Sequence, residues 1–376
     1  MRIGLVTPYM QPHHGGIEQV AEQLFRAYSS RGFEVQWVAS RVPHDALLRE
    51  GGRVRVPCWN GFERLLGVPV PLWGSAGIRE LAGLCQWANV LHVHDCLYPC
   101  SALATFFAQR HVKPVLLSQH IGFTHYRFLA LNGIEWLAYH TLGRWVLRRA
   151  AHVVLVTPRS RDYIPRLMRG SLHASTIPNG IDVTRFKPVG PDGRRAARVR
   201  LNLPTNVKIA LFAGRLVANK GIDIILAVAR SFPAVLVLIV GDGPLRHLLK
   251  NAAPNVVWQP RVNNDRMPDC YQAADCLLLP SVDEGLPIVV QEALACGLPA
   301  VVSDGELYAV PLVQAAACAT AARTPESMAE RLNEVISGRL VLDGGHAYAE
   351  AEWSLQTMVD RYLAILERLA VTVPSN

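Results

Sequence analysis

The sequence SVDEGLPIVVQEALACGLP occupies residues 281–299 and holds two glutamates, Glu284 and Glu292, separated by seven residues. The apolar run 276–279 just before it predicts a buried parallel strand. Pro287 stands where the first helical position is expected, and Gly297 stands where the residue just past a helix end is expected. The stretch therefore predicts a strand, a tight turn that carries Glu284, a helix that carries Glu292, and then a second apolar strand.

The predicted turn has a definite chemistry. A helix N-terminus at the carboxyl end of a parallel strand binds anions, because unpaired backbone N–H groups point out of it. A carboxylate there would repel a phosphate, so we expect Glu284 to bind hydroxyl groups of a sugar or a ribose. The alternative interpretation is that Glu284 caps the helix at the positive end of its dipole. Glu292 lies on a largely apolar helix, where a carboxylate is costly unless it is hydrogen-bonded.

Short apolar runs alternate with stretches of helical spacing along the whole chain, which predicts the α/β class with parallel, doubly wound sheets. Residues 188–205 are rich in Pro, Gly and Arg and are expected to form a loop. The expected strands are 3–7, 35–39, 90–93, 115–118, 153–157, 209–212, 235–240, 256–258, 276–279 and 300–302. The expected helices include 19–30, 136–149, 223–230 and 245–251.

The composition is that of a globular protein. Half of the 376 residues are hydrophobic and 18% are charged, and a chain of this length is expected to form two domains. No apolar run approaches the about 20 residues of a membrane span, and residues 1–6 already have the pattern of a strand rather than of a signal peptide. The eight cysteines are scattered and are expected to be free thiols in a reducing compartment, with no metal site. We therefore expect a cytoplasmic protein that is peripheral at the inner face of the membrane.

The net charge of +8 is unevenly distributed. Residues 1–175 contain 19 Lys and Arg against 10 Asp and Glu, whereas the remainder contains 19 against 20. The first half is therefore expected to meet an anionic partner, either a membrane surface or a pyrophosphate-bearing lipid. A basic surface that only improves solubility is the alternative, and no nucleic-acid-binding motif accompanies the charge. One candidate segment for the membrane contact holds Trp136, Tyr139, Arg144, Trp145, Arg148 and Arg149. The alternative is that Trp136 and Trp145 are core residues.

The chain resembles the retaining glycosyltransferases of the GT-B fold, family 4 (glycosyl transferases group 1). The long segment with the two glutamates carries most of the resemblance, and five shorter motifs accompany it in the family's order. These are Gly15-Gly16-Ile17-Glu18, Pro178-Asn179-Gly180-Ile181-Asp182, Gly214-Arg215-Leu216, Lys220-Gly221 and Gly241-Asp242-Gly243-Pro244.

The resemblance implies two Rossmann-like domains that face each other across a cleft. Residues 1–175 would form the acceptor-side domain and residues 176–353 the domain that binds a nucleotide sugar. In the family the last helix usually crosses back onto the first domain. Residues 354–370 have the apolar spacing for that packing.

The resemblance also implies the donor site. Arg215 and Lys220 would hold the donor diphosphate, the first by its planar fork and the second as a point charge, so that no metal and no cofactor is needed. Glu292 would accept the ribose hydroxyls, and Glu284 would bind hydroxyls of the transferred sugar. Backbone amides after Gly285, including that of Leu286, would reach the sugar or the phosphate.

Three positions in the first half are implied in the same site. Gly15 and Gly16 lie on the loop after the first strand, where the absence of a side chain lets a ligand approach the backbone. His120 ends the strand 115–118 and would lie beside the donor sugar. Glu18 is expected to cap the following helix. His92 and His94 alternate on another strand and are interpreted as structural.

The function that follows is a retaining, metal-independent transfer of a hexose from a nucleoside-diphosphate sugar. The acceptor is expected to be a saccharide, lipid-linked, in the synthesis of an envelope polysaccharide or exopolysaccharide. A nucleotide-sugar epimerase of the same fold and a non-catalytic nucleotide-sugar-binding protein are the alternatives. Residues 303–308 depart from the family pattern, which leaves the donor's identity open.

Overall fold

The computed structural model divides into two compact units, and each is described by itself. Unit 1 comprises Met1–Gly180 with Gln356–Asn376, and unit 2 comprises Ile181–Leu355. The division falls a few residues after the boundary expected at 175 and 176. The structure describes residues 1–11, 13, 16–41, 47–66, 68–120, 129–157, 159–160, 164, 172–260 and 262–371.

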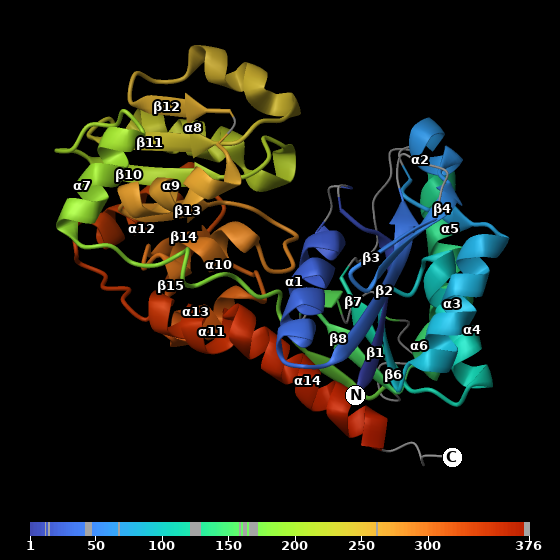
Figure 1. Ribbon diagram of the computed structural model, residues 1–376. Coiled ribbons are helices and arrows are strands. Elements are labelled where there is room, and N and C mark those ends of the chain that lie inside the picture. Colours follow the sequence, from blue (N-terminus) through green and yellow to red (C-terminus); the bar gives the residue numbers. More distant parts are fainter. Residues whose placement is uncertain are drawn as a thin grey trace. The chain divides into compact units, whose positions relative to one another are not determined.

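Unit 1 is built on a nine-stranded sheet in which the apolar runs of the sequence form the central strands (Figure 1). The strand order is β3-β4-β2-β1-β6-β7-β8-β9, and β5 pairs with β4. The pairings are parallel except for those of β3 and β5 with β4. The strands are β1 (Arg2–Tyr9), β2 (Glu34–Arg41), β3 (Leu48–Glu50), β4 (Arg53–Trp59), β5 (Leu72–Trp73), β6 (Val90–His94), β7 (Val115–Gln119), β8 (His152–Leu155) and β9 (Ala174–Thr176).

Helices cover both faces of this sheet, which is why its central strands are apolar throughout. Figure 1 shows α1 on one face and α3 with α4 on the other. The helices are α1 (Gly16–Ser30), α2 (Gly61–Leu66), α3 (Ser75–Trp87), α4 (Pro99–Arg110), α5 (Leu129–Ala138), the π-helix η1 (Tyr139–Gly143), α6 (Arg144–Arg149) and, from residue 356 on, α14 (Leu355–Val371). On α14, Tyr362 is buried and its hydroxyl accepts a hydrogen bond of 3.0 Å from Ser118 of β7.

Unit 2 holds a six-stranded sheet of order β12-β11-β10-β13-β14-β15, with every pairing parallel. The chain runs outward from β10 to β12 and then returns to place β13 on the other side of β10. The strand order therefore reverses between β10 and β13, where ligands bind in open α/β sheets. The strands are β10 (Lys208–Ala213), β11 (Val235–Val240), β12 (Val256–Gln259), β13 (Cys276–Leu279), β14 (Ala300–Ser303) and β15 (Cys318–Ala321).

The connections of unit 2 are helical. Packing joins α8 to α12, α10 to α13 and α7 to α9. The α-helices are α7 (Pro191–Arg200), α8 (Ile222–Ser231), α9 (Met267–Ala273), α10 (Ile288–Ala295), α11 (Ala309–Gln314), α12 (Pro325–Ile336) and α13 (Gly345–Trp353), and the 3₁₀ helices are η4 (Ala218–Lys220), η5 (Pro244–Asn251) and η6 (Asn264–Arg266).

The helix expected at 245–251 is present, as part of a 3₁₀ helix. Two local predictions were wrong. Residues 188–205 contain α7 rather than only a loop, because Pro191 starts the helix and Arg198 anchors it. The guanidinium of Arg198 is buried and donates to Asp275 at 2.8 Å, a tertiary contact that local composition does not reveal. Pro287 is the residue before α10, whose first residue is Ile288.

Three stacked histidines lie on neighbouring strands of unit 1: His92 and His94 are buried on β6, and His120, which follows β7, is half-buried. The ring centroids of His92 and His94 lie 4.5 Å apart, and those of His94 and His120 lie 4.9 Å apart. Burial lowers the pKa of His92 to about 3 and that of His120 to about 4, and it holds the pKa of His94 well below its ordinary value. All three side chains are therefore neutral near pH 7.

This stack predicts acid lability. The unfolded chain binds protons on these histidines near pH 6.5, while the folded chain does so only at much lower pH, so stability falls as the pH drops from about 6.5 towards about 4. Urea unfolding measured across this pH range should show that the free energy of unfolding falls less steeply with decreasing pH in His92→Gln than in the wild type. His111→Gln removes an exposed histidine and should leave the slope unchanged. Equal slopes for all three proteins would contradict the prediction.

Candidate functional site

The candidate site lies at the edge of the unit 2 sheet where β10 and β13 end. These strands pair in parallel, with Ala210 opposite Cys276, so their carboxyl ends meet at one edge and bring together the loops 214–221 and 280–287. The two loops are joined directly, because the backbone N–H of Val282 donates to the carbonyl of Asn219 at 2.9 Å. Arg323 bridges them as well, donating to the carbonyls of Pro280 and Ala218.

An ion pair crosses between these loops. The Nζ atom of Lys220 lies 2.5 Å from Oε1 of Glu284, and the two side chains are 18% and 14% exposed. The attraction is stronger in this partly desolvated position than it would be in bulk water. Arg215 lies on the same loop as Lys220 and is exposed, and its side chain makes no hydrogen bond or ion pair with the part of the chain that the structure describes. Among the described residues this edge therefore holds Lys220 paired with Glu284, Arg323 bonded to two backbone carbonyls, and Arg215 with an unpaired side chain.

Glycine allows the loops to come this close. Gly221 has a φ of +71°, a conformation that side-chain-bearing residues rarely adopt. A Cβ atom at this position would lie 2.5 Å from the carbonyl oxygen of Pro280. The Lys220-Gly221 motif is thus required by the approach of one loop to the other, as well as by the charge that it carries.

Glu292 is held on α10 by a tyrosine. The hydroxyl of Tyr271 on α9 donates to Oε2 of Glu292 at 2.7 Å. Burial raises the pKa of the Glu292 carboxyl, while the hydrogen bond from Tyr271 and the positive charge of Arg185 oppose that rise. Glu292 thus has the hydrogen bond that its apolar helix requires. Tyr271 could not be identified from the sequence, because it lies on a different helix.

Glu306 is a second residue that sequence reasoning missed. Its carboxylate is buried and accepts the backbone N–H of Asp283 at 2.8 Å and that of Glu284 at 3.2 Å. Asp283 has a φ of +63°, so the turn needs such support. The available signal was an acidic residue within 303–308, the stretch that departs from the family pattern. Gly285 and Leu286, which are half-buried, continue the supported turn towards α10.

The remaining predicted positions belong to unit 1. His120 follows β7, where its Nε2 lies 2.8 Å from Nδ1 of His94 and its backbone N–H donates to Asp95. Gly16 is the first residue of α1, and a Cβ there would meet nothing within 4 Å. Packing within the unit therefore does not require glycine at this position. Gly15 lies outside the described residues, and the participation of all three in the donor site stays a prediction.

A polar cluster at the end of β1 was not anticipated. His13 lies between two carboxylates, with Nδ1 2.9 Å from Glu18 and Nε2 3.0 Å from Glu63. The tyrosine hydroxyl of Tyr9 donates to Asn60 and to Glu63. Hydrogen bonding to Glu18, followed by Glu63, raises the pKa of His13 against the opposing effect of burial. The side chain of Glu18, in the first turn of α1, thus contacts His13.

Within the described residues there is no group of three or more His, Cys, Asp or Glu side chains that could hold a metal ion. Their helices include none that is both long and apolar enough to cross a membrane.

Comparison with known proteins identifies the class. Residues 193–349 match the model of "Glycosyl transferases group 1", and residues 14–185 match that of "Glycosyltransferase Family 4". A phosphatidyl-myo-inositol mannosyltransferase of Mycobacterium tuberculosis is 29% identical over 94% of this chain and 94% of its own length. An alpha-galactosylglucosyldiacylglycerol synthase of Streptococcus pneumoniae is 28% identical over 68% of this chain and 70% of its own.

The solved structures agree on the fold. A sucrose-phosphate synthase of Thermosynechococcus elongatus aligns with a TM-score of 0.75 at 17% identity, covering 99% of this chain and 100% of that one. The two family models together span most of both units. The chain belongs to the group 1 glycosyltransferases of the GT-B fold, as the motifs of the sequence predicted.

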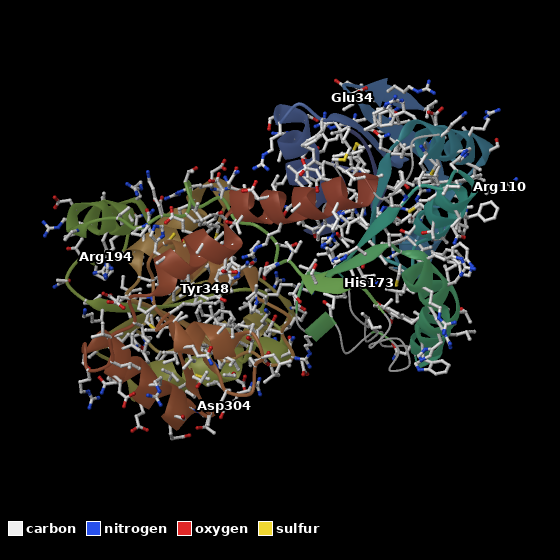
Figure 2. All side chains as sticks on the ribbon, turned by 90° about the horizontal axis from the view of Figure 1, so that it is seen from below. Glu34, Arg110, His173, Arg194, Asp304 and Tyr348 are labelled. Carbon is white, nitrogen blue, oxygen red and sulfur yellow. The ribbon has the colours of Figure 1, made fainter. Side chains whose placement is uncertain are left out.

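We expect the support from Glu306 to be measurable. In Glu306→Gln one acceptor oxygen is replaced by an NH₂ group, so one of the two charge-assisted hydrogen bonds to the turn is lost, a cost of about 1.5–3 kcal/mol. Donor turnover, measured as kcat/KM, should fall by roughly tenfold or more. Asp304→Asn changes an exposed neighbour (Figure 2) and should behave as the wild type. Wild-type kinetics in Glu306→Gln would show that the turn does not depend on this carboxylate.

Proposed function

We propose that this protein is a retaining glycosyltransferase that moves a hexose from a nucleoside-diphosphate sugar to a lipid-linked saccharide in envelope or exopolysaccharide synthesis. The observation that carries the proposal is the Lys220–Glu284 ion pair beside Arg215 at the strand-order reversal of unit 2. A diphosphate needs cations, and a sugar needs hydrogen-bond acceptors for its hydroxyls. This edge offers both within two joined loops.

The cations would bind the donor diphosphate. Arg215 would supply a planar fork that matches two phosphate oxygens, and Lys220 a mobile point charge. Lys220 immediately precedes Gly221 and α8, so the N-terminus of that helix would add to the positive potential. When the diphosphate takes over Lys220, Glu284 becomes available to accept hydrogen bonds from the sugar. Charge neutralisation of the leaving group by these side chains would make a metal ion unnecessary.

Glu292 would hold the nucleoside. Tyr271 occupies Oε2, so Oε1 would accept hydroxyls of the ribose. In its ionised form the carboxylate of Glu292 would accept strong hydrogen bonds from the ribose hydroxyls, because charge-assisted hydrogen bonds are stronger than neutral ones. Burial raises the pKa of Glu292, and the same burial would strengthen its hydrogen bonds to the ribose.

The transfer itself would occur on one face of the sugar. The bond between the anomeric carbon and the diphosphate breaks, the acceptor oxygen forms its bond from the same side, and a phosphate oxygen of the leaving group takes the acceptor's proton. Neutral His120 would hydrogen-bond the sugar, and Gly15 and Gly16 would leave room for it. In this scheme no side chain forms a covalent intermediate, and the configuration at the anomeric carbon is retained.

The acceptor assignment rests on two supports. The relatives from M. tuberculosis and S. pneumoniae have names that denote lipid glycosylation, and the excess positive charge of this chain lies in residues 1–175. Such charge would attract the protein to an anionic membrane surface where a lipid-linked saccharide is found. An incubation with UDP- and GDP-sugars and lipid-linked acceptors, followed by product analysis, tests the reaction and its stereochemistry.

Two substitutions test the donor site. Lys220→Ala and Glu292→Ala should each weaken donor binding by about 1.5–3 kcal/mol, the value of a hydrogen bond to a charged group, while the fold is kept. Isothermal titration calorimetry with the donor identified by the screen measures the effect, and circular dichroism checks the fold. Lys250→Ala and Glu330→Ala, in the same unit, are matched controls. Unchanged affinity in both site variants would refute the site assignment.

Chelation tests the charge neutralisation by side chains. Transfer should survive EDTA, because Arg215 and Lys220 supply the positive charge at the diphosphate. The measurement is the initial rate of sugar transfer before and after chelation, and again after addition of Mg²⁺ or Mn²⁺. A rate that is lost with EDTA and restored by either ion would mean that a metal bridges the donor diphosphate.

A further inference from the structure

The helical run α5–η1–α6 of unit 1 presents large apolar side chains to solvent. Ile134, Trp136 and Leu137 on α5 are 63%, 54% and 55% exposed. Single exposed apolar residues are ordinary on a protein surface, but several neighbours on one helix indicate a contact surface. Tyr139, which follows them, is buried, so the opposite side of the run is the one that packs against the unit.

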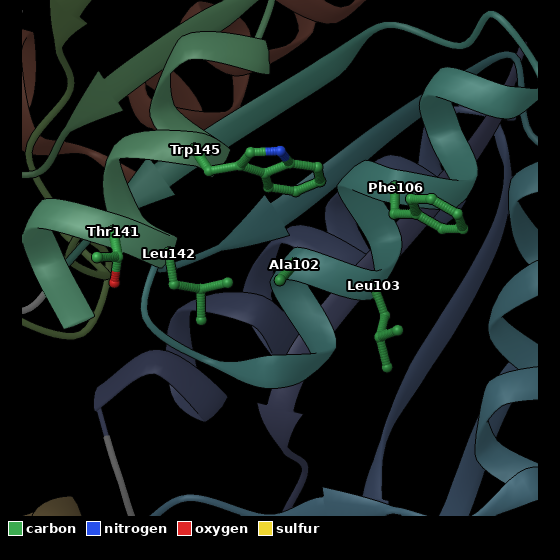
Figure 3. Close-up of a pocket in the computed structure, with 6 residues that line it drawn as sticks. All are labelled: Ala102, Leu103, Phe106, Thr141, Leu142 and Trp145. Atoms are coloured by element: carbon green, nitrogen blue, oxygen red, sulfur yellow. The ribbon is translucent and has the colours of Figure 1, made fainter.

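A hollow lies next to this run, between it and α4. It has a volume of about 550 Å³ and is lined by Ala102, Leu103, Phe106, Thr141, Leu142 and Trp145 (Figure 3). The polar groups among these side chains are the hydroxyl of Thr141 and the indole N–H of Trp145. Phe106 is 43% exposed. At one end α6 is joined to α4, because the side chain of Arg149 donates a hydrogen bond of 3.0 Å to that of Gln109.

Cationic side chains border the apolar surface. The guanidinium of Arg149 lies 4.5 Å from the ring centroid of Trp145, and that of Arg110 lies 5.7 Å from the ring centroid of Phe106. Figure 2 shows Arg110 at the outer edge of its unit. Residues 99–150 contain six Lys and Arg and a single acid, Glu135. Positive charge is therefore adjacent to apolar side chains on both α4 and α6.

We propose that this surface, the α4–α6 face, binds an anionic phospholipid bilayer, with Ile134, Trp136, Leu137 and Phe106 entering the interface and Arg110 and Arg148 on the headgroups. Tryptophan suits such a boundary because its ring is apolar while its N–H remains hydrated. Long cationic side chains lay their stems on apolar surface and keep their charge among phosphates. The inference deepens the proposed function, since it names the surface through which the enzyme meets its lipid-linked acceptor.

The charge selects a bilayer over a second copy of the chain. A symmetric dimer would place the same patch of each copy against the other, so that these arginines would face one another with little acid to neutralise them. An anionic bilayer instead offers many phosphates to the cations and an apolar layer to the side chains between them. The α4–α6 face thus offers both the apolar side chains and the positive charge that peripheral membrane binding requires.

The experiment is vesicle co-sedimentation of the full chain. The vesicles are phosphatidylcholine alone, or an equal mixture of phosphatidylcholine and phosphatidylglycerol. The wild type should bind the mixed vesicles, and binding should weaken as salt rises. Ile134→Gln with Leu137→Gln, and separately Arg148→Glu, should each weaken binding by about tenfold. Val199→Gln and Arg195→Glu make matched changes at exposed positions of α7 in unit 2 and should leave binding unchanged.

The outcomes separate this inference from the proposed function. Equal binding of wild type and α4–α6 face variants, or equally weak binding of the wild type to both vesicles at low salt, would overturn it. A dimer seen by sedimentation and lost in the Ile134/Leu137 variant would also overturn it, because the face would then be a self-interface. Hydrolysis of the donor sugar should be the same in all these variants, since Arg215 and Lys220 lie in unit 2. If neither the wild type nor any variant hydrolysed the donor sugar, that result would count against the proposed function and not against the membrane surface.

Discussion

The parallel pairing of β10 with β13 is the constraint on which the candidate site depends. These strands are separated in the chain by two other strands, yet they end side by side. The loops that follow them bring Lys220 against Glu284 and tie Val282 to Asn219. Without that register the two motifs would be unrelated turns. The position of the site is thus a consequence of sheet topology, and its chemistry comes from the side chains placed on it.

Three carboxylates of unit 2, Glu306 buried and Glu284 and Glu292 half-buried, each have a specific neighbour. Glu284 pairs with a cation, Glu292 accepts a tyrosine hydroxyl, and Glu306 accepts two backbone N–H groups. Removing a carboxylate from water is expensive, and each contact offsets part of that cost. The three arrangements differ in what they leave available for a ligand. Glu306 is committed to the turn, whereas Glu284 and Glu292 have partners that a donor could replace or join.

Unit 1 contains uncharged stacked histidines and also carries exposed arginines. The histidine stack is kept uncharged by burial, while Arg110 is exposed beside Phe106 and Arg148 is exposed on α6. The two features serve different requirements. In the function that we propose, a neutral His120 would hydrogen-bond the sugar, and the basic, apolar surface would hold the protein at a bilayer. The excess positive charge lies in the first half of the sequence. This asymmetry matches our proposal that unit 1 is the unit that meets an anionic bilayer.

The sequence by itself determined the class of the fold, because buried parallel strands are apolar runs. It also singled out Arg215, Lys220, Glu284 and Glu292, which the structure places on two joined loops and on α10 of unit 2. It did not reveal α7, which depends on the distant contact of Arg198 with Asp275. The roles of Tyr271 and Glu306, and the joining of the two loops, were decided only in the tertiary structure. Each depends on residues far apart in the chain that the sheet brings within hydrogen-bonding distance, and local patterns carry no record of such contacts.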